Sequence, residues 1–515
     1  MPAVRTLLHN GVVLGPDPAD EPTALAIEGD RIVWVGDERG AGAYSAADEV
    51  VDLDGALLTP AFVDSHVHTV QAGFRLTELD LHGSTSRTDL LDRLAAHASV
   101  ATQGSVLLGQ GWDETLWSDN RPPTAQEVDI ATGGHRTFLS RIDGHSAVVS
   151  TALAAAVPGV ESQDGWSADG RVERDAHHAV RAVLGGLVGP EQRLTAARHA
   201  VRTMAAQGLV GFHENAAPHI GPEYEVALVR QAAEEAGLRV TVYWGELGAL
   251  DAAQRLGVRG LAGDLNADGA IGSRTAALHG SYADRDRHCG HGYLSATQIA
   301  EHVVLCTEAG LQAGFHCIGD AAMEAVSEGF ERAAGVVGPD RVRAGRHRLE
   351  HVEMPSAAVI QVLSRLGVTA SVQPVFDALW GGPDGMYAER LGERWKGMNP
   401  FRSMLEAGVR LAFGSDSPVT PIGPWGAVRA AVQHQDPDQR LGVRAAFEAH
   451  TRGGWRAGLD DDSGTLEVGL RADLAVWDLA EALGSDGLPE LDAELPTLRR
   501  TISAGRTIHD VEVDA

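Results

Sequence analysis

Two histidines separated by a single residue, His66 and His68, follow an apolar run that ends with Phe62 and Val63. In a β-strand this spacing puts both imidazoles on one face. At the carboxyl end of a barrel strand both would point at one spot, which is how a protein supplies half of a zinc coordination sphere. The chain has 22 histidines, so such a pair also arises by chance. Whether this pair is a metal site or a chance occurrence therefore has to be judged from the rest of the chain.

Further residues that could bind a metal or move a proton follow apolar segments later in the chain. They are His316, Glu350, His351 and Asp416. Three of them have an ordinary alternative when taken alone: a satisfied core histidine for His316, a surface histidine for His351 and a helix N-cap for Asp416. Together, imidazoles and carboxylates suit borderline divalent metals such as zinc. A shared site requires that all of them lie at the same end of one sheet.

The middle of the chain alternates apolar strand patterns with amphipathic helical patterns, which is typical of a parallel α/β fold. The eight strand candidates are Phe62–His66, Leu209–His213, Arg239–Tyr243, Leu261–Asn266, Leu311–His316, Arg348–His351, Val368–Val372 and Val409–Phe413. One helix is predicted over Tyr224–Ala236, before the C-cap Gly237. Another is predicted from the N-cap Asp320 to Gly335. Eight strands with intervening helices predict a TIM (β/α)8 barrel, which builds its active site at the carboxyl ends of the strands.

The remaining segments predict two further units in this chain of 515 residues. The interval between the first and second strands is too long for a barrel loop, so we expect an inserted subdomain there. Short strand patterns at both ends of the chain predict one small β-sandwich formed by both termini. The predicted division is 1–56 plus 465–515 for the sandwich, 57–74 plus 201–464 for the barrel, and 75–200 for the inserted subdomain.

The composition argues against several classes of function. The net charge of −29 disfavours nucleic acid and anionic membranes as partners. No apolar run approaches the roughly 18 residues of a membrane span, and the first residues carry no export signal. Three cysteines without a C-x-x-C pair fit reduced thiols, so we expect a cytoplasmic protein. The expected partner is a small-molecule substrate, and the sequence leaves open whether the chain forms a homo-oligomer.

Several motifs, taken in order, resemble the amidohydrolase superfamily and within it the amidohydrolase 3 branch, which includes N-substituted formamide deformylases. The motifs are the pair at His66 and His68, then Asp268–Ala276, His316–Asp320, Arg348–His351, Ser415–Pro418 and Gly464–Leu474. The resemblance covers nearly the whole chain. It implies a metal-dependent hydrolase that cleaves a C–N bond of an amide, formamide or cyclic amide. The alternatives are a deaminase or another hydrolase on the same metal centre, and a catalytically silent relative that binds a small molecule.

The resemblance also implies roles for individual residues. The expected ligands of a divalent metal, zinc in the first instance, are His66, His68, His316, His351 and Asp416. Zinc lowers the pKa of its bound water to about 7; Asp416 would pass the water's proton to the leaving nitrogen, and His351 or the metal would polarise the carbonyl. The expected substrate-binding residues of the inserted subdomain are Trp112, Asp113, Arg141 and His145. A core aromatic is the alternative for Trp112.

One position departs from the resemblance. Many relatives have a lysine four residues before the Asp-Gly of strand four, and its carbamate bridges two metals; here that position is Asp264, and the only lysine is Lys396. An aspartate there is expected to be too short to bridge. Glu214 is the best substitute, with a structural carboxylate as its alternative. Because two close divalent ions repel without an anion between them, one ion is expected rather than two.

Overall fold

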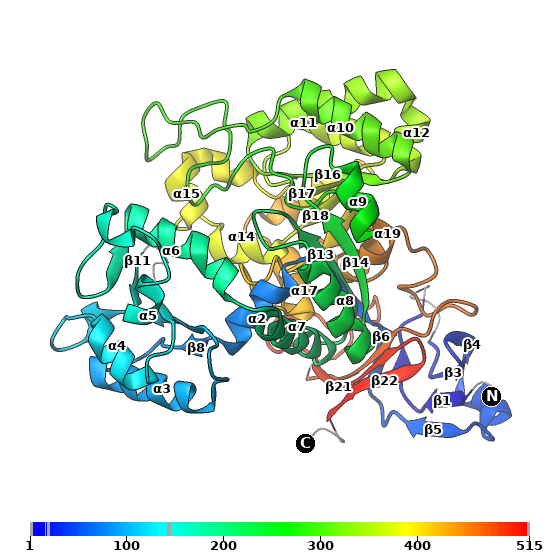
Figure 1. Cartoon of the computed structure of the whole chain (residues 1–515). Helices are drawn as coiled ribbons and strands as arrows, with labels where there is room; N and C mark the ends of the chain where they lie inside the picture. Colours follow the sequence, from blue (N-terminus) through cyan, green and yellow to red (C-terminus); the bar gives the residue numbers. More distant parts are fainter. Residues whose placement is uncertain (1–3, 16, 18–20, 142–145, 481, 512–515) are drawn as a thin grey trace. The chain divides into compact units, whose positions relative to one another are not determined.

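The computed structural model describes residues 4–15, 17, 21–141, 146–480 and 482–511. The chain forms two compact units, one made of Met1–Thr69 and Val201–Ala515 and the other of Val70–Ala200 (Figure 1). Among the described residues, no helix combines the length and the apolar character needed to cross a membrane.

The larger unit contains eight parallel strands, each paired with the next one along the chain. They are β7 (Phe62–Val67), β13 (Leu209–Ala216), β14 (Arg239–Trp244), β15 (Gly260–Leu261), β16 (Gln312–Cys317), β17 (Arg348–His351), β18 (Thr369–Val372) and β19 (Arg410–Phe413). A parallel bridge between Val67 and Ser417 brings the end of β7 against the chain that follows β19. The sheet therefore curls into a nearly closed barrel, and the predicted TIM fold is confirmed.

The fourth strand is the one that differs most from its prediction. Only Gly260 and Leu261 form regular pairs, although an isolated bridge between Asn266 and His316 resumes the pairing farther along. Gly263 explains the interruption, because its φ of +79° lies in the left-handed region and breaks the extended chain. The segment that follows, including Asp264, is therefore not held at regular strand positions.

Helices follow most of the strands. They are α8 (Glu225–Ala236), α9 (Leu250–Leu256), α10 (Ala296–Ala309), α11 (Asp320–Val337), α12 (Pro339–Ala344), α13 (Ala357–Leu366), α14 (Pro374–Trp380), α15 (Met386–Leu391), α16 (Phe401–Glu406), α17 (Pro424–Val432), α18 (Val443–His450) and α19 (Arg452–Ala457). Helix α8 ends at Gly237 as predicted, with φ at +75°. Helix α11 differs: its N-cap is Gly319, and it continues through Gly335 to Val337. Asp320 is its first residue, and its carboxylate accepts hydrogen bonds from the backbone N–H groups of His279 and Ala321.

Segments from both ends of the chain build the small sandwich. One sheet has the order β4-β3-β1-β5, and the other has the order β2-β6-β20-β21-β22. The strands are β1 (Arg5–His9), β2 (Val12–Val13), β3 (Ala24–Glu28), β4 (Arg31–Gly36), β5 (Glu49–Asp52), β6 (Leu57–Pro60), β20 (Leu474–Asp478), β21 (Thr497–Ser503) and β22 (Arg506–Asp510). One hydrophobic cluster joins side chains of the two sheets, among them Leu25, Leu58, Leu474 and Ile502. The two termini thus share one core.

The smaller unit is inserted after the first barrel strand and has its own sheet, in the order β12-β11-β10-β9-β8. Its strands are β8 (Leu79–Asp80), β9 (Leu107–Trp112), β10 (Thr137–Arg141), β11 (Ser146–Val149) and β12 (Arg171–Glu173). Its main helices are α3 (Arg87–Val100), α4 (Ala125–Thr132), α5 (Thr151–Ala154) and α6 (Arg174–Leu187), while α2 (Thr69–Thr77) and α7 (Pro190–Ala205) connect it to the rest of the chain. Barrel, terminal sandwich and insert together confirm the predicted fold class.

Candidate metal centre and substrate cavity

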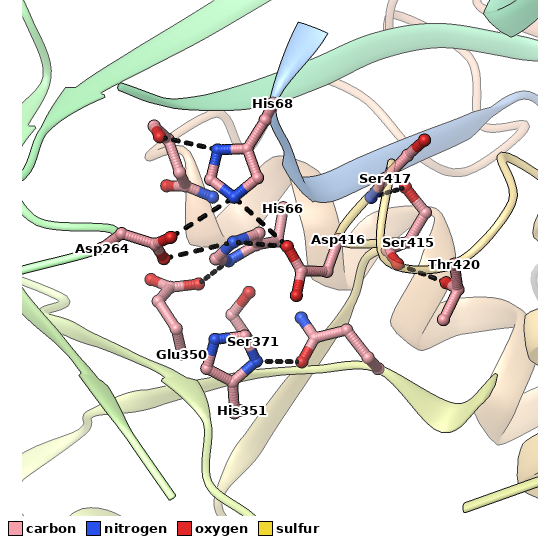
Figure 2. A network of polar contacts seen from close by, with 12 residues as sticks. His66, His68, Asp264, Glu350, His351, Ser371, Ser415, Asp416, Ser417 and Thr420 are labelled. Atoms are coloured by element: carbon pink, nitrogen blue, oxygen red, sulfur yellow. Dashed lines mark hydrogen bonds and ion pairs between the residues drawn. The ribbon is translucent and has the colours of Figure 1, made fainter. Parts of the chain in front are cut away.

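His66 in β7 and His68, just after this strand, point at two carboxylates from other parts of the barrel, as Figure 2 shows. The Nε2 atom of His66 lies 3.4 Å from an oxygen of Asp264 and 3.4 Å from an oxygen of Asp416. The Nε2 atom of His68 lies 3.3 Å from the other Asp264 oxygen and 3.2 Å from the same Asp416 oxygen. Both histidines are buried, at 0% and 7% exposed. Four side chains from three segments therefore converge on one small volume.

The other two expected imidazole ligands, His316 and His351, lie at the same place. The ring of His351 is centred 5.1 Å from that of His66 and 4.5 Å from that of His316. Two sets of potential ligand atoms each fit within 4.8 Å: His66 with His68 and Asp416, and His66 with Asp264 and His351. The structure thus brings together all five residues that the sequence analysis selected, and adds Asp264.

Asp264 reaches the centre, and that it is too short to bridge two metals stays a prediction. Its two carboxylate oxygens face His66 and His68 separately. The expectation assumed that Asp264 occupies a regular strand position, but the left-handed turn at Gly263 interrupts the strand just before it. The backbone path, and not a long side chain, brings this carboxylate to the centre.

Glu214, the predicted substitute bridge, belongs to neither set of potential ligands. One of its oxygens accepts hydrogen bonds from both the backbone N–H and the hydroxyl of Thr69. Glu214 therefore fixes the chain just after His68, which favours its alternative interpretation as a structural carboxylate.

Each of three imidazoles at the centre is oriented by an acceptor on its other nitrogen. The Nδ1–H of His66 donates to Glu350 at 2.9 Å, that of His68 to the carbonyl of Asn215 at 3.1 Å, and that of His351 to Gln373 at 2.7 Å. Because each partner atom can only accept, Nδ1 of each ring carries a proton, and Nε2 is the atom left to bind a metal or a second proton. Such partners set the tautomer and the ring orientation of metal-binding histidines. With this tautomer, His351 cannot donate a hydrogen bond from Nε2 to polarise a carbonyl.

Glu350 is itself held by a fully buried arginine. Arg348 donates to both carboxylate oxygens of Glu350, at 2.6 and 2.9 Å, and to Nδ1 of His213 at 2.8 Å. Burial raises the pKa of Glu350, but Arg348 and His66 outweigh it and hold that pKa at about 2. Glu350 therefore keeps its negative charge next to His66.

The centre has the properties of a site for a divalent cation. Nε2 of His66 and one oxygen of Asp264 are buried and have no hydrogen-bond partner among the described residues. Lone-pair nitrogens and carboxylate oxygens repel each other at 3.2–3.4 Å unless a positive charge lies between them. Burial alone lowers the pKa of His66, yet Asp416, Glu350 and Asp264 raise it to about 10. A divalent ion with mixed nitrogen and oxygen ligands would supply that positive charge.

A cavity of about 320 Å³ opens onto the centre. Its polar end is formed by His68, Asp264, His316, His351 and Asp416, and the rest of its lining is formed by Ala270, Ile271, Gly272, Ile318, Glu353, Phe376, Trp380, Met386, Tyr387 and Val419. A row of rings runs along this wall: His351 to Phe376 at 5.9 Å, Phe376 to Trp380 at 4.7 Å, and Trp380 to Tyr387 at 6.1 Å. The cavity can therefore hold a small molecule with one polar reacting group and an apolar or aromatic body.

The predicted substrate-binding residues of the insert differ in their surroundings. Trp112 is only 1% exposed, donates its indole N–H to the carbonyl of Leu139 at 3.0 Å and packs in a hydrophobic core of the smaller unit. These contacts favour the core alternative for Trp112. Arg141 pairs with Asp113 at 3.0 Å and with Glu114 at 2.9 Å, and a substrate role for Asp113 and Arg141 stays a prediction. His145 lies outside the described residues.

Comparison with known proteins places the chain in a family. A sequence profile of the amidohydrolase family matches residues 49–509. The chain is 26% identical over 522 residues to protein LONG AFTER FAR-RED 3 of Arabidopsis thaliana, covering 92% of this chain and 88% of that one. It is 25% identical over 502 residues to the N-substituted formamide deformylase of Arthrobacter pascens, covering 88% and 90%.

The fold is also that of solved structures. A crystal structure of an uncharacterized metal-dependent hydrolase from Pyrococcus furiosus superposes with a TM-score of 0.77 at 24% identity, over 92% of this chain and 98% of that chain. The family profile spans the barrel, the insert and the sandwich strands from β5 onward. The chain belongs to the amidohydrolase family, and it is a hydrolase that acts on carbon–nitrogen bonds other than peptide bonds.

Proposed function

We propose that this protein hydrolyses the C–N bond of a small N-substituted amide, with N-substituted formamides as the first class to test. The observation that carries the proposal is the convergence of His66, His68, Asp264 and Asp416, with unsatisfied buried ligand atoms, at the polar end of an apolar cavity. The formamide deformylase relative supports the choice of substrate class. An amide group at the polar end would leave its nitrogen substituent against the aromatic wall.

The residues that would hold the metal are His66, His68, Asp264 and Asp416, with His316 and His351 beside them. One ion is proposed, and zinc is the first candidate. The reason is that both sets of potential ligands share His66, whose Nδ1 is already bonded to Glu350. Its single Nε2 lone pair can bind only one ion. When bound, the metal supplies Lewis acidity toward the carbonyl and lowers the pKa of a water to about 7.

The chain's own groups would handle the protons. Burial raises the pKa of Asp416, but His66 and His68 outweigh it and lower that pKa, so the carboxylate is ionised and able to accept a proton from the attacking water. Asp416 would then deliver this proton to the leaving nitrogen. His351, in contrast, is neutral, because burial lowers its pKa. Its Nε2 can therefore accept a hydrogen bond or a proton. His351 therefore suits a role as a ligand or as a proton acceptor beside Asp416.

The test is hydrolysis by protein that has been stripped with a chelator and reloaded with zinc. N-substituted formamides should release formate and the free amine in equal amounts, and the stripped protein should release neither. The variant His68→Asn should lose activity while its circular dichroism stays that of the parent. Release of ammonia would indicate a deaminase instead. Failure to hydrolyse formamides, N-acyl amino acids, hydantoins and lactams would overturn the proposal.

A further inference from the structure

Glu353 is a carboxyl group in the otherwise apolar part of the cavity wall. It is 3% exposed, lines the cavity and belongs to neither set of potential metal ligands. The apolar and aromatic residues that share this wall are Ile271, Ile318, Phe376, Trp380 and Met386. A carboxyl group in such surroundings is unfavourable unless a partner satisfies it.

The described part of the chain does not supply that partner for one of its oxygens. The Oε2 atom of Glu353 has no hydrogen-bond partner among the described residues, and neither does the hydroxyl of Tyr387. Burial raises the pKa of Glu353 and the neighbouring Tyr387 hydroxyl lowers it, so the two groups lie near each other although they form no regular hydrogen bond. Glu353 and Tyr387 thus place two polar groups without a regular hydrogen bond in one apolar wall of the cavity.

The backbone before Glu353 has an unusual conformation. His351 and Val352 both have positive φ, at +71° and +51°. This region is unfavourable for residues with a β-carbon, and above all for a β-branched residue such as Val352. Such strain persists only where the surroundings enforce it, and it clusters at ligand sites. Here it holds a path on which both His351 and Glu353 line the cavity.

We propose that Glu353 is a specificity-determining residue, which accepts a hydrogen bond from an O–H or N–H group on the apolar substituent of the substrate. The inference rests on the proposed function, because it places the scissile amide at the metal centre and the substituent along the wall. The preferred substrates are then amides whose aromatic or apolar substituent carries one hydrogen-bond donor. The hydroxyl of Tyr387, at the far end of the row of rings, would lie next to this donor group of the substrate.

The test uses N-formyl phenethylamine and its ortho-, meta- and para-hydroxyl derivatives. The zinc-loaded protein should favour at least one hydroxyl isomer about tenfold or more in kcat/KM, since a buried polar group discriminates against a ligand that leaves it unpaired. In Glu353→Leu this ratio should fall to near one. In Glu353→Gln much of it should survive, because the amide oxygen still accepts a hydrogen bond. Met386→Leu, a change in the same wall that keeps the carboxyl, should preserve the ratio.

Binding to the metal-depleted protein separates this inference from the proposed function. Calorimetry with the same compounds should show tighter binding of the preferred isomer to the parent and to Glu353→Gln, but not to Glu353→Leu. If the loaded enzyme hydrolyses none of the amides and this pattern of binding is found, the function fails and the role of Glu353 stands. A hydroxyl preference that Glu353→Leu leaves intact overturns the inference, as does equal or undetectable binding of all four compounds to the parent.

Discussion

Glu350 is fully buried and is not among the residues that line the cavity, yet replacing it with glutamine should weaken metal binding. The side chain keeps its shape and can still accept a hydrogen bond from Nδ1 of His66, now 2.9 Å from the carboxylate. What is lost is the negative charge that favours electron density on the imidazole. Loss of such a partner typically reduces metal affinity 10- to 100-fold. Because the hydrogen bond can survive, we expect a loss near the lower end, about tenfold.

The same change should destabilise the metal-depleted protein. Arg348 is fully buried, and Glu350 is the carboxylate that pairs with its guanidinium. Removing one member of a buried ion pair costs about 3–5 kcal/mol, because the other charge is left uncompensated. Arg348 keeps its hydrogen bonds to the carbonyl of Ser65 and the hydroxyl of Ser371. We therefore expect a decrease of about 3 kcal/mol in the free energy of unfolding.

Two measurements separate these effects. Competition with a chromophoric chelator gives the zinc dissociation constant, and urea unfolding of the metal-depleted protein gives the stability. Adding Arg348→Met to Glu350→Gln should recover much of the stability, since no buried charge is left unpaired, but should not restore the affinity. Glu353→Gln is the matched control, a buried carboxyl nearby that contacts no imidazole nitrogen. A dissociation constant for Glu350→Gln within threefold of the parent would refute the argument that this carboxylate tunes His66.

Three further predictions follow from the same contacts. The parent protein should have a zinc-to-protein ratio near one by elemental analysis, and a stable ratio near two would exclude a single ion. Asp264→Asn should lower this ratio well below one. An unchanged ratio in this variant would show that Asp264 is not a ligand. Glu214→Gln should leave that ratio unchanged and lower the Tm, because only the bonds to Thr69 weaken; a lower ratio would show that Glu214 holds metal. Burial raises the pKa of Glu353 to about 8 from a usual value of 4.5. The folded protein therefore binds this proton more tightly than the unfolded chain does. The resulting contribution to stability is fully present below about pH 4.5 and is lost as the pH rises through about 8. The Tm of the metal-depleted protein should therefore fall from pH 5 to pH 9, and fall less in Glu353→Leu; equal slopes would contradict this assignment.

The barrel could be predicted from the sequence because each strand has a local pattern that does not depend on distant residues. Seven of the eight strand predictions differ from the observed strands by at most a few residues at an end. The fourth strand differs more, and helix α11 runs two residues past its predicted end; both differences involve glycine. Gly263 interrupts a strand through its left-handed φ, whereas Gly335 is accommodated inside a helix. A glycine permits both outcomes, and tertiary packing decides between them.

The candidate centre could be predicted only in part, for a related reason. The pair His66 and His68 is a local pattern on one strand, so its geometry follows from strand alternation. The place of Asp264 depends on the turn at Gly263 in another strand, which no local pattern predicts. The contacts of Trp112 depend likewise on how the insert packs its own core.

Strand β17 shows most clearly what alternation alone cannot predict. Successive side chains of a regular strand point to opposite faces, so Arg348 and Glu350 share the barrel interior, where they contact each other. His351 would then point away, yet its ring lies 5.1 Å from that of His66, to which Glu350 is also bonded. The positive φ of His351 and Val352 breaks the alternation at this point. The strained turn thus allows two consecutive residues to serve the same centre. Glu350 orients His66, and His351 is itself a candidate ligand.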